Sequence, residues 1–314
     1  MTAGPHRPLA LRAVFVDANP ALAAVADTML RLPGVEFRVH RDPDVRPDAL
    51  PAVIGDAAIA LVDHTALPLP VARACARLAH VVFLGTGARS YMDPEALAAH
   101  GVAVHTIRGY GDTAVAECAI ALMFAASRGI AAMDRAMRAG AWQRTEGLQL
   151  TGRRLGLVGF GGIAREVARL ALGIGMEVVA YNRTPRSHPH VKAASLEDVL
   201  ATSDVVSLHL ALGDATRGIL SRERIAAMRR GAILVNTARG ALVDEAALVD
   251  ALRSGHLGHA GLDVYAIEPL PASHPFLTLP NVTLSAHSGF RTAEANRNLI
   301  GAALEHCRRI AASA

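Results

Sequence analysis

The stretch "RRLGLVGFGGIAREVARLALGIG", residues 153–175, decides the fold. An apolar run leads into a glycine-rich turn, and a helical pattern follows the turn. Gly159, Gly161 and Ala164 occupy the three positions of the pattern G-x-G-x-x-G/A. In a strand–turn–helix unit, the first glycine permits the tight turn and the second lets a pyrophosphate approach the backbone, while the small third residue lets helix and strand pack closely. The alternative is a glycine turn that binds nothing.

This turn predicts a phosphate site, because the following helix presents free N–H groups and the positive end of its dipole to an anion. A second apolar strand ends at Tyr181, which completes the strand–helix–strand unit in which the motif occurs. The residues expected to contact a dinucleotide here are Gly159, Phe160, Gly161, Gly162 and Ile163.

The alternation of strands and helices extends along most of the chain and predicts an α/β fold. Apolar runs such as "RAVFVD" (12–17) and "AAIALVD" (57–63) are typical of parallel strands covered by helices on both faces. Because 314 residues exceed one ordinary domain, we expect two doubly wound, Rossmann-like parallel-sheet domains joined by long helices. Strands are expected near 13–17, 35–40, 57–63, 80–85 and 102–107, and then near 154–159, 176–181, 203–208, 232–236, 258–264 and 282–285.

The helical segments follow from apolar periodicity and capping residues. One long helix is expected from Thr113 to about Ala139, and a final amphipathic helix over 291–310. Further helices are expected to start at Gly161, Ser195, Ser221 and Asp244.

Composition excludes several classes of protein. The net charge is +4, but the basic residues are scattered arginines with Lys192 as the only lysine, which argues against a nucleic-acid partner. Three widely spaced cysteines fit a reducing cytosol rather than a disulfide framework. The N-terminus has no signal-peptide pattern, and Glu117 interrupts the longest apolar segment, which is too short to span a bilayer. We therefore expect a cytoplasmic protein without a membrane partner.

Several ordered blocks resemble the D-isomer-specific 2-hydroxyacid dehydrogenases. They are "FLGTGA" (83–88), "GYGDTAVAE" (109–117), "LGLVGFGGIA" (155–164), "DVVSLHLAL" (204–212), "GAILVNTARGALVDEAALVDALRSG" (231–255), "AGLDVYAIEPLP" (260–271) and "NVTLSAHSGF" (281–290). Before about residue 80 the likeness is only architectural. The resemblance implies a flavodoxin-like substrate-binding domain, residues 1–107 plus 291–314, and a dinucleotide-binding Rossmann domain, residues 108–290.

The resemblance also implies the catalytic residues. His287 matches the family's acid/base, and a histidine can hold and release a proton near neutral pH. Glu268 matches its carboxylate partner, which favours the imidazolium form. Arg239 matches the substrate clamp, since a guanidinium forks onto a carboxylate and can polarise a carbonyl oxygen. Without the family, the three would be a loop histidine, a surface acid and a surface ion-pair arginine. Ala286 stands where the family usually has proline.

Further contacts are implied by the same likeness. The backbone N–H groups of the loop Gly85, Thr86 and Gly87 would hold the substrate carboxylate, although the next residues, "ARSYMD", depart from the family pattern. Asp263 would hold the nicotinamide carboxamide, and Thr237 and Ala238 would lie beside the cofactor. The family reaction needs no metal, so no metal site is expected.

The end of the strand in "VVAYNRTPR" (178–186) indicates the type of cofactor. An acid here would accept the ribose hydroxyls of NAD and repel a 2′-phosphate, but the chain has Asn182. Arg183 can pair with that phosphate, and the Thr184 hydroxyl can donate to it, with Arg186 as a second candidate. "NRT" resembles the "SRT" of NADP-preferring family members. NADP(H) is therefore expected to be preferred and NAD(H) possible; a drifted NAD site is the alternative.

The sequence thus predicts an NAD(P)H-dependent 2-oxoacid reductase, acting on glyoxylate or hydroxypyruvate, with a homodimer formed through the helix of 113–139. Phosphite dehydrogenases are similar but use a lysine in the substrate loop, and Lys192 is far from that loop in the sequence. A dinucleotide-sensing binding protein of the same fold, with little catalytic activity, is the alternative from another class.

Overall fold

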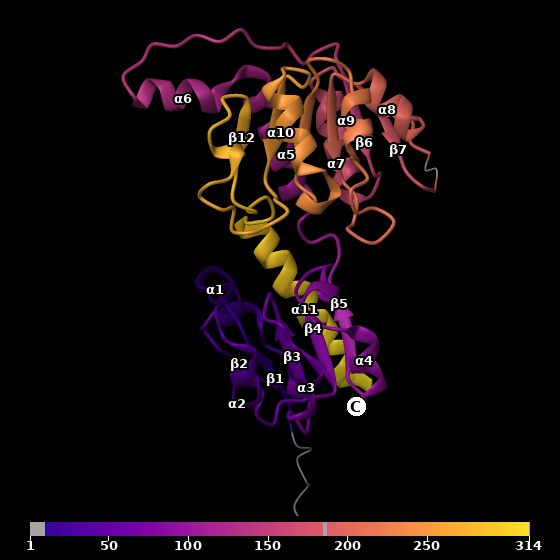
Figure 1. Ribbon diagram of the computed structural model, residues 1–314. Coiled ribbons are helices and arrows are strands. Elements are labelled where there is room, and N and C mark those ends of the chain that lie inside the picture. The colour runs from indigo at the N-terminus through magenta and orange to yellow at the C-terminus, as the bar shows by residue number, and fades with distance from the viewer. Residues whose placement is uncertain (1–9, 185–186, 314) are drawn as a thin grey trace, which may run out of the picture. The chain divides into compact units, whose positions relative to one another are not determined.

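The computed structural model describes residues 10–184 and 187–313. The chain divides into two compact units (Figure 1). The first unit contains residues 10–111 and 291–313, and the second is Asp112–Phe290. Each is a parallel sheet with helices between its strands, so the expected fold class is confirmed. The first boundary lies at Gly111, whereas the sequence predicts it near Ile107.

The first unit has a five-stranded sheet in the order β2-β1-β3-β4-β5, the flavodoxin-like order, with all pairs parallel. Its strands are β1 (Leu11–Phe15), β2 (Val35–Val39), β3 (Ile59–Val62), β4 (His80–Phe83) and β5 (Ala103–Thr106). Its helices are α1 (Pro20–Met29), η1 (Pro47–Ala49), α2 (Leu50–Ile54), α3 (Leu69–Arg73), η2 (Ala88–Ser90), α4 (Pro94–Ala99) and α11 (Ala293–Ser313). The last helix packs on α1, where Leu22, Leu299 and Ile300 are buried in one cluster.

The second unit has a seven-stranded parallel sheet in the order β12-β11-β10-β9-β6-β7-β8. The strands are β6 (Arg154–Val158), β7 (Glu177–Tyr181), β8 (Lys192–Ala193), β9 (Val205–Leu208), β10 (Ile233–Asn236), β11 (His259–Leu262) and β12 (Val282–Leu284). The strand order reverses at β6, which lies between β7 and β9. Ligands of open α/β sheets bind outside the carboxyl ends of the strands at such a reversal.

The helices of the second unit are α5 (Asp112–Arg128), α6 (Ile130–Arg138), α7 (Gly162–Gly173), α8 (Leu196–Thr202), α9 (Arg222–Ala227), η3 (Gly240–Leu242), α10 (Glu245–Arg253) and η4 (Pro275–Leu277). The side chains of Ser195, Ser221 and Asp244 each accept a backbone N–H from the first turn that follows. The predicted starts at these three caps are therefore confirmed, because each cap satisfies an N–H that the helix leaves unpaired.

The prediction of one helix over 113–139 is wrong. Gly129 adopts a left-handed conformation, with φ of 61°, and separates α5 from α6. The two helices are bent by 67°. The core-facing residues of α5 are buried, whereas α6 has no buried residue. Over residues 10–184 and 187–313, no single helix is long and apolar enough to cross a membrane, and α5 with α6 meets that test only as a bent pair.

Candidate active site

The glycine-rich turn joins β6 to α7 in the way that the motif predicts. Gly159 has φ of 95°, and a Cβ there would lie 2.6 Å from the His209 carbonyl oxygen, so only glycine fits. Ala164 is fully buried. A Cβ at Gly161 would meet no atom within 4 Å, and no side chain caps α7 at this residue. The first turn of α7 therefore has N–H groups that no side chain caps, as an anion site requires, although the Asp112 carboxylate packs against the next residue, Gly162.

Asn182, at the end of β7, is bonded to this turn. Its Oδ1 accepts the N–H of Phe160 (3.1 Å), and its Nδ2 donates to the Thr184 carbonyl oxygen (2.6 Å). An aspartate could keep the first hydrogen bond but not the second, because a carboxylate has no N–H to donate. Arg183 and Thr184 are exposed beside it. Arg186, the second candidate for the 2′-phosphate, lies outside the described residues.

The turn after β10 carries the predicted substrate clamp. The buried Asn236 fixes this turn, because its side chain accepts the N–H of Ala238 (3.0 Å) and donates to the Arg239 carbonyl oxygen (2.9 Å). The Arg239 side chain is exposed, and its guanidinium donates to the Ala238 carbonyl oxygen (2.6 Å). The Thr237 hydroxyl is buried without a hydrogen-bond partner among the described residues. It therefore offers a hydrogen bond to a bound molecule, directly after the carboxyl end of β10.

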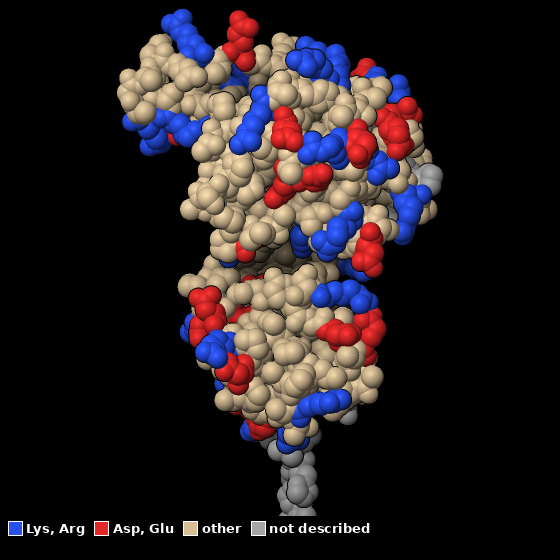
Figure 2. Space-filling view, in the orientation of Figure 1, with Lys and Arg blue, Asp and Glu red and all other residues tan. Residues whose placement is uncertain are grey.

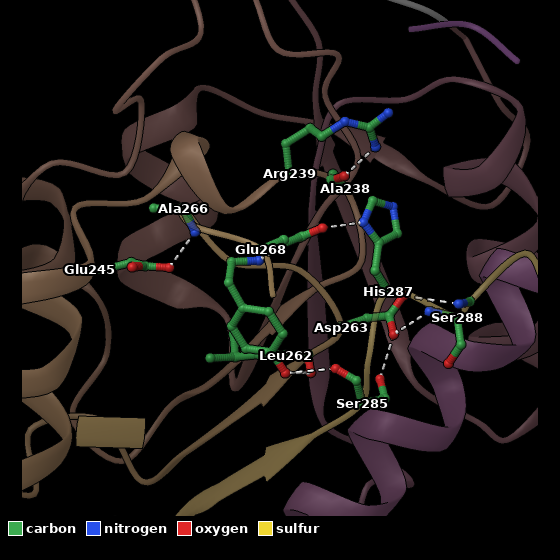
Figure 3. A network of polar contacts seen from close by, with 12 residues as sticks. Ala238, Arg239, Glu245, Leu262, Asp263, Ala266, Glu268, Ser285, His287 and Ser288 are labelled. Carbon is green, nitrogen blue, oxygen red and sulfur yellow. Dashed lines mark hydrogen bonds and ion pairs between the residues drawn. The ribbon is translucent and has the colours of Figure 1, made fainter. Parts of the chain in front are cut away.

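His287 and Glu268 form a close pair. Glu268 Oε2 lies 2.6 Å from His287 Nδ1, and Figure 3 shows the carboxylate directed at the imidazole ring. Glu268 Oε1 also accepts the N–H of Tyr265 (2.9 Å), which fixes the carboxylate against its own loop. The side chains of His287 and Glu268 are 39% and 33% exposed, so the outer edge of the ring is accessible. A carboxylate in this place orients the ring, because it bonds to Nδ1 and leaves the other ring nitrogen free of that contact.

Asp263 anchors the turn that carries His287. Its carboxylate accepts the Ser285 hydroxyl (2.6 Å) and the N–H groups of Ser288 (3.0 Å) and Gly289 (2.9 Å). Its carbonyl oxygen accepts the N–H of His287 (2.8 Å). His287 has φ of 47°, the only non-glycine residue with positive φ among those described. Such a backbone costs about 1–2 kcal/mol, and these bonds hold it in a turn that lacks the family's proline. The predicted contact of Asp263 with a nicotinamide stays a prediction.

Burial keeps neighbouring titratable groups uncharged. It lowers the pKa of His209 to about 4, and the His209 ring lies 2.8 Å from the Ser207 hydroxyl. It raises the pKa of Cys118 to about 11, with a smaller contribution from Asp263, and it raises the pKa of Tyr265. Near neutral pH, His209 is therefore a neutral imidazole and the other two keep their protons.

Gly85, Thr86 and Gly87 belong to the first unit, at the carboxyl end of β4. The Ile107 N–H donates to the Gly85 carbonyl oxygen (3.0 Å). Within the part of the chain that the structure describes, the N–H groups of Thr86 and Gly87 have no hydrogen-bond partner. Free N–H groups of this kind can bind a carboxylate.

Three residues around this pair do not stand out in the sequence: Glu245, Tyr265 and His274. Glu245 Oε1 accepts the N–H of Ala266 (2.8 Å), and the Tyr265 hydroxyl donates to the Ser285 carbonyl oxygen (2.6 Å). The one signal for Glu245 was its place after the helix cap Asp244, which indicates helix capping rather than a site. Among the described residues, no group of three or more histidine, cysteine or acidic side chains could hold a metal ion.

Comparison with known proteins gives consistent similarities. Residues 120–289 match the family model described as D-isomer specific 2-hydroxyacid dehydrogenase, NAD binding domain. A hydroxypyruvate reductase of Thermotoga maritima is 41% identical over 205 residues, which cover 63% of this chain and 67% of that protein. A D-3-phosphoglycerate dehydrogenase of Mycobacterium tuberculosis is 38% identical over 269 residues, 83% of this chain and 50% of that protein. The chain thus spans about half the length of that relative.

A solved structure of the TT0316 protein from Thermus thermophilus has the same fold. Its TM-score is 0.84 at 37% sequence identity, and the match covers 94% of this chain and 95% of that chain. This likeness extends over both units, including the first, where the sequence resemblance was only architectural.

Proposed function

This chain belongs to the D-isomer-specific 2-hydroxyacid dehydrogenase family, and we propose that it reduces small 2-oxo acids to 2-hydroxy acids with NADPH as its preferred cofactor. The observation that carries the proposal is the contact of 2.6 Å between Glu268 and His287, in the unit that also holds the glycine-rich turn. The pair supplies a proton donor, and the turn supplies a place for the cofactor's phosphates.

Each residue has one task in the reduction. His287 gives its proton to the ketone oxygen as the carbonyl bond is reduced, and Glu268 stabilises the imidazolium before that transfer. The Arg239 guanidinium, exposed at the end of β10, binds the substrate carboxylate and the negative charge that develops on the ketone oxygen. The free N–H groups of Thr86 and Gly87 stay the predicted substrate contacts of the first unit. The cofactor, when bound, supplies the hydride.

The residues present fit a dinucleotide. The uncapped first turn of α7 beside Gly161 suits the pyrophosphate, with Phe160, Gly162 and Ile163 in the same turn. The buried Thr237 hydroxyl, which has no partner among the described residues, can bond to the bound molecule. Ala238 and Asp263 complete the assigned cofactor contacts at the ends of β10 and β11.

The preference for NADPH rests on the end of β7. Asn182 carries no charge to repel a 2′-phosphate, and its amide is engaged with Phe160 and Thr184. The exposed Arg183 and the Thr184 hydroxyl are the groups assigned to that phosphate. We expect kcat/KM with NADPH to exceed that with NADH at least about tenfold, equivalent to roughly 1.4 kcal/mol. Equal values would contradict this preference and leave the dehydrogenase function intact.

Hydroxypyruvate and glyoxylate are the proposed substrates, and a relative named hydroxypyruvate reductase supports the first. We assign the dinucleotide to the second unit, and the family resemblance implies that the first unit is the substrate-binding domain, with Thr86 and Gly87 as its predicted contacts. A homodimer formed through α5 and α6, and a cytoplasmic location, stay predictions.

A kinetic screen tests the function. Purified protein is assayed for NADPH and NADH oxidation with hydroxypyruvate, glyoxylate, pyruvate, 3-phosphohydroxypyruvate and bulky 2-oxo acids. We expect turnover with hydroxypyruvate or glyoxylate, reduced about 10²- to 10⁴-fold by His287→Ala, the range that acid–base catalysis supplies. His100→Ala, at an exposed histidine of the first unit, is the matched control. No turnover with any 2-oxo acid would refute the enzyme, and a preference for 3-phosphohydroxypyruvate would correct the substrate.

A further inference from the structure

A second pair of carboxylate and imidazole lies behind the first. In the loop after β11, the N–H of Tyr265 donates to Glu268 Oε1 (2.9 Å), and the next N–H, that of Ala266, donates to Glu245 Oε1 (2.8 Å). The second oxygen of Glu245 lies 3.6 Å from His274 Nε2, as the second oxygen of Glu268 lies beside His287. Figure 3 shows Glu245 on the far side of this loop from His287. Two adjacent peptide groups thus hold two carboxylates, each with its own histidine.

The peptide between Tyr265 and Ala266 has no room to move toward η3. A Cβ at Gly240 would lie 1.9 Å from the Tyr265 carbonyl carbon, so the backbones of the two segments are in direct contact. The Tyr265 side chain links the loop to a second segment, because its hydroxyl donates to the carbonyl oxygen of Ser285 (2.6 Å), two residues before His287. The loop that carries Glu268 is therefore linked to the turn that carries His287, and Glu245 fixes the loop from α10.

The two pairs differ in their access to solvent. The side chains of Glu245 and His274 are each 19% exposed, against 33% and 39% for Glu268 and His287. The His274 ring also packs on Phe276, with ring centroids 4.5 Å apart. Glu245 is the first residue of α10, where the helix dipole favours a carboxylate. Glu245 and His274 are thus suited to hold the loop rather than to contact a substrate.

We propose that Glu245, backed by His274, is a positioning residue that sets the Glu268 carboxylate against the His287 ring. Its effect on catalysis rests on the proposed reductase function, whereas its effect on the Glu268–His287 contact does not. Catalysis is sensitive to such placement, because an error of about 1 Å can cost about 100-fold in rate.

Two substitutions at Glu245 distinguish the effect of side-chain length from the effect of negative charge. Glu245→Asp keeps the charge at the start of α10 but is one methylene too short for the Ala266 N–H. Glu245→Gln loses the charge but keeps an oxygen that can accept the Ala266 N–H. Glu223→Asp is the matched control, since Glu223 is an exposed carboxylate in the first turn of α9. Circular dichroism confirms that each variant is folded, and Glu245→Gln keeps the test valid if Glu245→Asp does not fold.

Two measurements follow. In kinetics we expect Glu245→Asp to lower kcat about tenfold or more with KM for NADPH within about twofold, while Glu245→Gln and Glu223→Asp stay within about threefold of wild type. In proton NMR, the hydrogen on His287 Nδ1 should give a downfield resonance, identified by its loss in His287→Ala. We expect that resonance to broaden or move upfield in Glu245→Asp and to persist in Glu245→Gln.

The outcomes are distinct. An unchanged His287 resonance in Glu245→Asp overturns the inference, whether or not the wild-type protein turns over a substrate. A changed resonance with wild-type kcat overturns the catalytic part of it. A changed resonance in a protein without any turnover upholds the positioning of the pair and refutes the proposed function instead. If Glu245→Asp does not fold, loss of the resonance in Glu245→Gln overturns the role of the acceptor oxygen.

Discussion

At the scale of single residues, the proposed role of His287 as a proton donor depends on the negative charge of Glu268. Glu268→Gln keeps the shape of the side chain and can still accept the N–H of Tyr265, but it cannot stabilise an imidazolium at His287. We expect kcat to fall about 10- to 100-fold, part of the total effect of acid–base catalysis, with KM for NADPH little changed. Steady-state kinetics test this, with the exposed Glu223→Gln as control. Wild-type kcat in Glu268→Gln would contradict the role.

A second prediction at this scale concerns Asn182. Asn182→Asp places a carboxylate beside the 2′-phosphate and removes the donor to the Thr184 carbonyl oxygen. We expect the ratio of kcat/KM for NADPH over NADH to fall at least about tenfold, or roughly 1.4 kcal/mol. Arg183→Ala should act in the same direction. Arg230→Ala, at an exposed arginine before the amino end of β10, is the control. An unchanged ratio in both test variants would place the phosphate elsewhere.

At the scale of elements, the bend between α5 and α6 reverses the expected effect of Gly129→Ala on stability. The substitution would stabilise a continuous helix, but it should destabilise the bent one. In a straight helix, alanine at position 129 would stabilise the protein by about 1 kcal/mol over glycine. In the bent form, Gly129→Ala forces a left-handed alanine, at about 1–2 kcal/mol, and places its Cβ 2.9 Å from Thr145 Oγ1. We therefore expect a lower free energy of unfolding, measured in urea. Gly140→Ala, with φ of 81° but no neighbour within 4 Å, has the same backbone strain without the close contact, so it should lower the free energy of unfolding less than Gly129→Ala does.

Elements whose signals are local were predictable from the sequence. The caps Ser195, Ser221 and Asp244 mark helix starts because each bonds to its own first turn. The break at Gly129 was not predictable, because apolar periodicity continues through it and a glycine within a helix gives no sign of its φ. The position of Glu245 was not predictable either, since it bonds to an amide 21 residues away that only the folded sheet brings near.

The candidate site shows the same division. Gly159 and Gly161 are recognisable because their roles depend on backbone geometry within one short turn. The resemblance pointed to Glu268 and His287, and the structure places them in contact. The bonds of Asp263 to the His287 turn, in contrast, come from residues 22 to 26 positions away along the chain. Sequence patterns name the reactive groups more readily than the residues that hold them.

At the scale of the whole molecule, the charged side chains on the face drawn in Figure 2 are of both signs and scattered over both units, so no single charged patch dominates that face.

Histidines give the two units different responses to pH. In the first unit, burial lowers the pKa of His80, His105 and His306, which lie together with His80 Nδ1 3.3 Å from His105 Nε2. In the second unit, burial lowers the pKa of His209 and His259 to about 4. The unfolded chain binds protons at these histidines below about pH 6.5. Both units should therefore lose stability as the pH falls from about 6.5.

Only the first unit has a described histidine whose pKa is raised. A hydrogen bond to Asp63, with further attraction from Asp17, raises the pKa of His64 to about 9. The stability that His64 contributes is present below about pH 6.5 and is lost as the pH rises through about 9. We therefore expect the first unit to be most stable near about pH 6.5, and the second to keep its stability between about pH 6.5 and 8.5.

Hydrogen exchange followed by mass spectrometry reports on the two units separately, once rates are corrected for their intrinsic dependence on pH. Between about pH 6.5 and 8.5 we expect protection in residues 10–111 to fall and protection in residues 112–290 to hold. His64→Asn should abolish that fall, because it removes the imidazole whose pKa is raised. His100→Asn, at an exposed histidine, should leave the fall unchanged. An equal alkaline loss in both units, or a loss that persists in His64→Asn, would show that His64 does not set this response.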